Sequence, residues 1–534
     1  FFKQKTAYEI YQCDWSSDVC SSDLDNAPLP TVPGSQSGAS WAQAVGNATA
    51  LAQWSYCFDR GDTDTSRGAA NQWNCSVTGS LNAADPLWNA TAQKLMISGS
   101  GVGSGIGTKG HYKTVEALKW MNENAPTGSY YVPAHLERAG PFNPDGNNGF
   151  NIESLRDFNN AAPNVAFGFE SQPGHGASAE RGEYRQLRNS FTGSSTNVDS
   201  VGGTTYGGTG VYAGYIGGVW DALLGEGRNW WFFASSDWHN RGSFGPDDRR
   251  STQDFQPGEY QRNYTMVRNG SDKLRPQTIV DGLRTGNNWA ASGQLIDRLA
   301  FVACVSYPGP GARTNAAVET LAFNAATGNT DINVSGCATM GEKLVVRPGA
   351  EIVVAVAVRD PAGTNYAPYS FPNPSLQQIG VTQPINQPVL HHVDLIRGMV
   401  TGYKTPGAPD YAGEWPRNTN WLHSDGTTAD LSAVPAAAKN TSAAVLRTFS
   451  GAGWTSAVSP VDGTAFLKMS YRIPAVAASQ YVRLRGTNMP PAVPFETDAS
   501  GNPLPDFFTN ATVTANLRIP CTTAGTNVPS NSVT

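Results

Sequence analysis

The spacing of apolar residues changes near residue 300, and no other feature of the sequence constrains the fold as strongly. Before that point, helical stripes with apolar residues three or four apart alternate with short apolar strands. We expect the strands at 129–134, 164–169 and 230–234, and the helices at 114–124, 152–158, 217–226 and 276–285. Helices that alternate with apolar strands favour parallel β/α units, either in a barrel or in an open sheet.

Beyond residue 300 the apolar residues recur at every second position, which is the period of a β-strand. The expected strands lie at 351–360, 389–398, 464–473, 479–486 and 511–520. Glycine, proline and asparagine separate them, so this part of the chain is predicted to be an antiparallel β-sandwich. The expected fold class is therefore α/β plus all-β, with one domain at 25–299 and a second at 300–534.

The first 24 residues, FFKQKTAYEIYQCDWSSDVCSSDL, have a different character from the rest of the chain. They contain neither the apolar stretch of a secretory signal nor the period of a helix or strand. The string resembles the conceptual translation of a sequencing adapter. We therefore treat 1–24 as foreign and expect the natural N-terminus to be missing.

Composition excludes several classes of protein. The 534 residues include 37 Lys and Arg against 43 Asp and Glu, and a net charge of −6 does not suit a nucleic-acid binder. Hydrophobic residues make up 39% and charged residues 15%, which indicates a folded chain. Because no run approaches about 18 apolar residues, we expect no membrane span. The sequence does not specify an oligomeric state.

The cysteines suggest two local pairings, Cys57 with Cys75 and Cys304 with Cys337. Disulfides at these positions would suit an exported protein, and buried free thiols are an equally good interpretation. Abundant Gly, Pro, Asn, Ser and Thr with few lysines is common in periplasmic or secreted proteins. We therefore expect the protein to be periplasmic or secreted.

Three of the expected strands run into polar residues suited to metal or acid–base chemistry. They lead to His135 in PAHLERAG, to Glu170 and His175 in GFESQPGHG, and to Asp237 and His239 in SSDWHNRG. In a β/α barrel the carboxyl ends of the strands converge, so these side chains would meet and could bind a divalent ion. Taken singly, each has a structural alternative, such as a surface loop for the Asp-x-His or an ion pair for Glu170.

These motifs, with IVDGLRTGNNWAASGQLID after them, resemble the PHP (polymerase and histidinol phosphatase) family of metal-dependent phosphoesterases over roughly residues 110–300. The resemblance implies a distorted (β/α)7 barrel with two or three divalent ions. His135 corresponds to the family's histidine ligand, and Asp237 and His239 to the ligand pair of its last motif. Glu170 and His175 are expected to be catalytic, although ligand, ligand-partner and substrate-contact roles all stay open for them.

The sequence departs from the family pattern at the start of the site. That family opens with a His-x-His pair, and no His-x-His occurs here; the first histidine is His111. Either the first barrel strands were lost with the upstream coding sequence, or the site is degenerate. We therefore expect an incomplete barrel and impaired activity. The other histidines, His111, His391, His392 and His423, are expected to be structural.

The expected reaction is hydrolysis of the phosphate ester of a small molecule, with Zn, Mn or Fe ions as the cofactor. Arg138 and Arg241 are expected to bind the phosphate through their bidentate guanidinium groups. Phosphodiester or amide-bond hydrolysis at a similar metal site stays open. The alternative is an exported binding or surface protein with a degenerate barrel and a ligand-recognising sandwich. The basic strand YVRLRGTN at 481–488 is expected to be a solvated sheet face.

Overall fold

The computed structural model describes eleven stretches of the chain: residues 18–21, 118–119, 121–122, 126–133, 152–173, 213–235, 261–307, 313–361, 389–404, 439–493 and 497–503. The chain divides into two compact units. Unit 1 comprises Phe1–Phe169, Val267–Arg284 and Lys404–Thr419. Unit 2 comprises Glu170–Met266, Thr285–Tyr403 and Asn420–Thr534. The expected strand at 511–520 lies outside the described residues.

Unit 1 has a strand and a helix that share one apolar core. The strand β2 (Ser129–Val132) pairs antiparallel with β1 (Asp18–Ser21) and forms an isolated parallel bridge from Tyr131 to Ala166. The helix α6 (Ile152–Ala161) has the spacing expected from the sequence, and its apolar face is fully buried. Phe158 meets the Tyr131 ring edge-on, with centroids 5.4 Å apart. Both elements were expected near these positions.

A second helix of unit 1, α10 (Pro276–Thr285), has the bounds predicted from its first-turn proline and apolar spacing. Its last-turn Arg284 donates hydrogen bonds to the carbonyl oxygens of Asn164 and Thr127, at 2.7 and 3.0 Å. Gln277, two turns earlier, also donates to the Thr127 carbonyl, at 2.5 Å. The helix is therefore fixed to the backbone that flanks β2.

Unit 2 begins within a short strand, β3, whose first two residues belong to unit 1. Further short strands and one short helix follow. The strand β3 (Gly168–Pro173) pairs with β4 (Trp231–Ser235), and the helix α9 (Val219–Gly225) lies between them in sequence. The strands β5 (Gln261–Thr265) and β6 (Asn288–Ser292) pair antiparallel. Asn263 accepts a hydrogen bond from the Ala234 backbone nitrogen at 2.9 Å, which connects β5 to β4.

The expected incomplete (β/α)7 barrel is wrong. Such a barrel needs a closed ring of parallel strands, each followed by a helix. The described strands instead form separate sheets of two, three and five, and β5 and β6 are antiparallel. The described residues contain four α-helices, all short, so the structure is mainly β. Local periodicity identified individual elements, but it carried no information on which strands pair.

The largest sheet of unit 2 has five antiparallel strands in the order β12-β13-β9-β7-β8. Their bounds are β7 Arg298–Tyr307, β8 Cys337–Thr339, β9 Ala350–Arg359, β12 Thr455–Val458 and β13 Ala465–Val476. Cys304 and Cys337 face each other across β7 and β8 and form a disulfide. This pairing, one of the two suggested by the sequence, is confirmed, whereas Cys57 and Cys75 lie outside the described residues.

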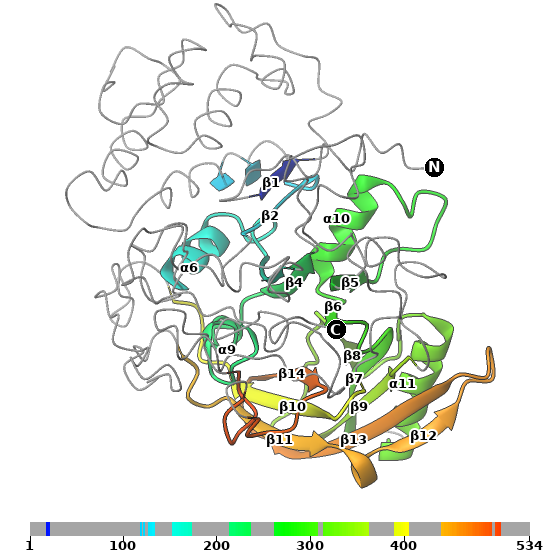
Figure 1. Ribbon diagram of the computed structural model, residues 1–534. Helices are drawn as coiled ribbons and strands as arrows, with labels where there is room; N and C mark the ends of the chain where they lie inside the picture. The colour runs from blue at the N-terminus through cyan, green and yellow to red at the C-terminus, as the bar shows by residue number, and fades with distance from the viewer. Residues whose placement is uncertain are drawn as a thin grey trace, which may run out of the picture. The chain divides into compact units, whose positions relative to one another are not determined.

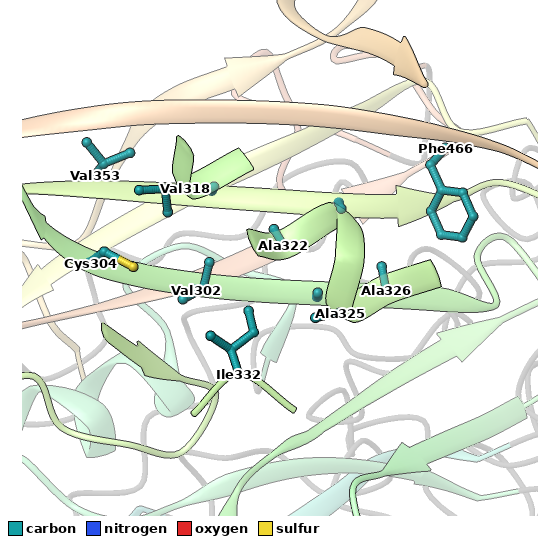
Figure 2. Close-up of a cluster of buried hydrophobic side chains, with 12 residues drawn as sticks. Val302, Cys304, Val318, Ala322, Ala325, Ala326, Ile332, Val353 and Phe466 are labelled. Carbon is teal, nitrogen blue, oxygen red and sulfur yellow. The ribbon is translucent and has the colours of Figure 1, made fainter. Parts of the chain in front are cut away.

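The helix α11 (Asn315–Gly328) covers one face of this sheet (Figures 1 and 2). Thr314 caps its N-terminus by accepting a hydrogen bond from the Ala317 nitrogen at 3.2 Å. Asn329 ends it in the left-handed conformation, with φ 50° and ψ 48°. Figure 2 shows the buried side chains of the helix and the strands: Val318, Ala322, Ala325 and Ala326 against Val302, Cys304, Val353 and Phe466. The small alanines let the helix approach the sheet closely.

A three-stranded sheet covers the other face. Its order is β11-β10-β14, with bounds Ala444–Phe449, His392–Met399 and Gln480–Thr487. Because side chains alternate along a strand, Val353, Ala355 and Ala357 of β9 face α11. The intervening Val354, Val356 and Val358 pack with Leu395 and Phe449 of the smaller sheet. This double burial explains why β9 is apolar at nearly every position.

None of the helices in the described part of the chain has the length and hydropathy that a membrane span requires.

Candidate functional site

Of the predicted site residues, Glu170 is the one that the described residues include. It lies on β3, is 3% exposed, and belongs to the strand that pairs with β4. β4 ends at Ser235, two residues before Asp237. The strand with Glu170 and the strand that leads to Asp237 and His239 are thus neighbours. The remaining predicted residues lie outside the described residues: His135, Arg138, His175, Asp237, His239 and Arg241.

No group of three or more His, Cys, Asp or Glu side chains that could hold a metal ion occurs within the described stretches. The Glu170 carboxylate has the right chemistry for a hard or borderline divalent ion. Its proposed companions belong to segments that the structure does not describe.

A buried ion pair joins α9 to β14. Arg483 binds Asp221 through both carboxylate oxygens, with Nε–Oδ1 at 2.6 Å and Nη2–Oδ2 at 2.7 Å. The two side chains are 4% and 0% exposed. The Gly217 nitrogen donates to Asp221 Oδ2 at 2.6 Å, and the guanidinium lies 5.1 Å from the centre of the Trp220 ring. The two parallel hydrogen bonds and the neighbouring indole ring together fix the geometry of this ion pair.

Tyr481 completes this cluster. Its hydroxyl donates to Asp221 Oδ1 at 2.8 Å. Burial, and next the negative charge of Asp221, raise the pKa of the Tyr481 hydroxyl, so the phenol stays protonated. Burial lowers the pKa of Arg483, but the Asp221 charge outweighs it and the net direction is upward. The cluster therefore consists of one anion, one cation and a neutral donor.

A second buried pair lies beside it on β14 and β10. Arg485 Nη2 donates to Asp394 Oδ2 at 2.7 Å, and Thr448 donates to Oδ1 at 2.6 Å. His392 Nε2 faces the same Oδ2 at 3.6 Å. Burial raises the pKa of Asp394, but the polar contact with His392, the charge of Arg485 and the hydrogen bond from Thr448 outweigh it and lower the pKa to about 2. Asp394 is therefore a carboxylate at neutral pH.

These clusters contradict the expectation of a solvated face at 481–488. Arg483 and Arg485 are 4% and 6% exposed. Alternating arginines in a strand indicate a solvent-exposed face unless their acidic partners are known. The partner of Arg483 could not be recognised from the sequence, because Asp221 lies 262 residues away. One signal of their burial was available in the sequence. Only 15% of the residues are charged, so two arginines this close together are unusual.

Unit 2 also contains a cavity of about 1330 Å³. Leu299 and Val356 contribute to its aliphatic wall, while Trp220, Trp231 and Trp289 supply indole rings. The Trp289 ring is stacked on that of Tyr264, with centroids 3.8 Å apart. Concave, mainly apolar cavities with a few polar groups are typical of small-molecule sites.

The arginines that line this cavity are each paired with a carboxylate. Arg228 binds Glu226 at 2.7 Å, Arg483 binds Asp221, and Arg485 binds Asp394. Their charges are thus balanced within the protein. Glu342 and Lys343, which are adjacent and of opposite charge, also line the cavity. The cavity therefore suits an uncharged ligand better than an anion.

Comparison with known proteins gives no relatives: no family model, no curated protein and no solved structure matches this chain.

Proposed function

We propose that the protein is a metal-dependent phosphoesterase that hydrolyses a small phosphorylated molecule. The structural observation that supports this is the adjacency of β3 and β4: buried Glu170 lies on one, and the other leads to Asp237 and His239. The other support for the proposal is the resemblance of the sequence motifs to the PHP family. The barrel is not part of the proposal.

In this proposal His135, Asp237 and His239 hold the divalent ion, which is Zn, Mn or Fe. A bound ion would lower the pKa of a water molecule and neutralise charge on the phosphoryl oxygens. Arg138 and Arg241 bind the phosphate through their guanidinium groups.

Glu170 and His175 take the acid–base roles in this proposal. His175 protonates the oxygen of the leaving group, and Glu170 orients or deprotonates the attacking water. The Cys304–Cys337 disulfide supports an oxidising, periplasmic or secreted location.

Manganese binding and turnover of p-nitrophenyl phosphate by the full chain test the proposal. We expect Asp237→Ala to weaken Mn²⁺ binding at least tenfold and to lower any Mn²⁺-dependent turnover about 100-fold or more. Asp272→Ala is the matched control, because Asp272 pairs with Arg268 elsewhere on the surface. Binding and turnover that Asp237→Ala leaves unchanged would overturn the proposal.

A second candidate is favoured by the cavity of unit 2: an exported protein that binds an uncharged, largely apolar small molecule. Its test is a titration with an apolar fluorescent probe, followed by tryptophan emission. Leu344→Asp introduces a charge into the lining, and we expect it to weaken probe binding at least tenfold. Equal binding by both proteins would exclude the cavity as the site.

A further inference from the structure

Two adjacent histidines at the start of β10 bring their ring nitrogens together. His391 Nδ1 and His392 Nδ1 are 2.9 Å apart, and the rings are nearly perpendicular at 86°. His391 is exposed, whereas His392 is 3% exposed. The His391 backbone nitrogen donates to the Thr487 carbonyl oxygen at 2.9 Å, so the backbone of the pair is fixed to β14.

The negative charge of a neighbouring carboxylate favours one position for the proton of His392. His392 Nε2 faces Asp394 Oδ2 at 3.6 Å, and Thr448 and Arg485 fix that carboxylate in place. An anionic neighbour favours the proton on Nε2, which leaves a lone pair on Nδ1. Metal-binding histidines commonly have this arrangement, with the distal nitrogen held by a carboxylate.

The separation of the two Nδ1 atoms distinguishes between metal geometries. Nitrogens bound at about 2.0–2.1 Å lie about 2.8–3.0 Å apart at the 90° angle of tetragonal coordination, but about 3.3–3.4 Å apart in a tetrahedron. The observed 2.9 Å is the length of a hydrogen bond between the two rings, and the same spacing fits the tetragonal case. A metal ion would replace this hydrogen bond, and the proton on His391 Nδ1 would be released to water. Imidazole ligands in that geometry suit Cu²⁺, which also binds most tightly among the divalent first-row ions.

We propose that His391 and His392 form a two-imidazole binding site for Cu²⁺, with Asp394 as the positioning residue of His392. Water completes the coordination on the exposed side of His391. His391 and His392 are not among the residues of the proposed phosphoesterase site.

Copper titration of the full chain tests this site. The chain would carry Asp237→Ala and His239→Ala, so that the proposed phosphoesterase ligands do not contribute. We expect one Cu²⁺ per chain, with an electron paramagnetic resonance spectrum split by two imidazole nitrogens. His391→Gln should weaken binding at least tenfold, and because His391 is exposed this change should not disturb folding.

His392→Gln is the second variant, and His423→Gln is the matched control that removes an imidazole elsewhere in the chain. The control should bind copper as tightly as its parent. Equal copper affinity in His391→Gln and its parent, or a spectrum without two nitrogen ligands, would overturn the proposal and identify the contact as an imidazole–imidazole hydrogen bond. Failure of the manganese test above leaves this result unaffected, since that test involves different residues.

Discussion

Burying a charged side chain is costly, and β14 carries two buried arginines. Arg483 and Arg485 lie on the same side of the strand, each with its own carboxylate, Asp221 and Asp394. Removing such ions from water costs several kcal/mol each, and the cost is offset only while both partners are present. Single substitutions at these positions should therefore be far more damaging than at surface ion pairs.

Asp221→Ala leaves Arg483 buried without its counter-ion. We expect it to lower the free energy of unfolding by about 3–5 kcal/mol, as measured by urea denaturation. The control is Arg268→Ala, which breaks an exposed pair with Asp272 and should cost less than about 1 kcal/mol. Similar losses for the two variants would show that the buried pair has no special role.

Asp394 should make stability depend on pH in the acid range. Its pKa is lowered from 3.8 to about 2 in the folded protein, so its contribution is complete above the unfolded pKa and is lost as pH falls through the folded pKa. The stability difference between the wild type and Asp394→Asn should therefore shrink by about 2 kcal/mol between pH 6 and pH 2. Urea denaturation at both pH values measures it. A difference that does not change with pH would contradict the assigned pKa.

The candidate site was only partly predictable from single residues. Types and spacing pointed to Asp237, His239 and Glu170, because carboxylates and imidazoles at strand ends suit metals. The contact between His391 and His392 was not predicted, since neighbouring residues of a regular strand point in opposite directions. His391 lies just before β10, where that rule no longer applies.

At the scale of elements, prediction succeeded where local signals were strong. The helix α10 has its predicted bounds, and β9, β13 and β14 lie within three residues of theirs. β3 begins four residues later than predicted, because the apolar run 164–169 includes the turn before it. The helix α11 was missed: its small alanines give almost no contrast between faces.

Two glycines with nearly identical backbone conformations offer a test at this scale. Gly341 and Gly349 have φ of 81° and 82°, which disfavours any side chain. A Cβ at Gly341 would overlap the Thr285 carbonyl oxygen, whereas nothing lies within 4 Å of one at Gly349. We expect Gly349→Ala to cost about 1–2 kcal/mol and Gly341→Ala clearly more, measured by urea denaturation. Equal costs would show that the loop of Gly341 moves freely away from Thr285.

At the scale of the whole molecule, the failure of the barrel prediction has a physical cause. Which strands pair depends on contacts between residues far apart in sequence, such as β9 with β13. A single sequence indicates the spacing of apolar residues and the positions of turns. Both are compatible with several orders of strands in a sheet. The pairing of Cys304 with Cys337 was predictable as an option because only 33 residues separate them.

That disulfide should contribute to the stability of the protein as a whole. The disulfide closes a loop of 33 residues and so lowers the conformational entropy of the unfolded chain. We expect this to stabilise the folded state by about 3–4 kcal/mol. We expect the double variant Cys304→Ala with Cys337→Ala to lose this amount in urea denaturation. A reducing agent should lower the midpoint of the wild type toward that of the variant, while the variant should not respond. A response of equal size in both would assign the effect to other cysteines.

The ion pair between α9 and β14 also has a consequence for how the chain is made. Arg483 follows Asp221 by 262 residues, so at typical synthesis rates the arginine emerges on the order of 10–50 s after the aspartate. During that interval Asp221 has to remain hydrated, and α9 cannot reach its final environment. The last strand of the small sheet, β14, therefore has to be synthesised before this buried pair can form.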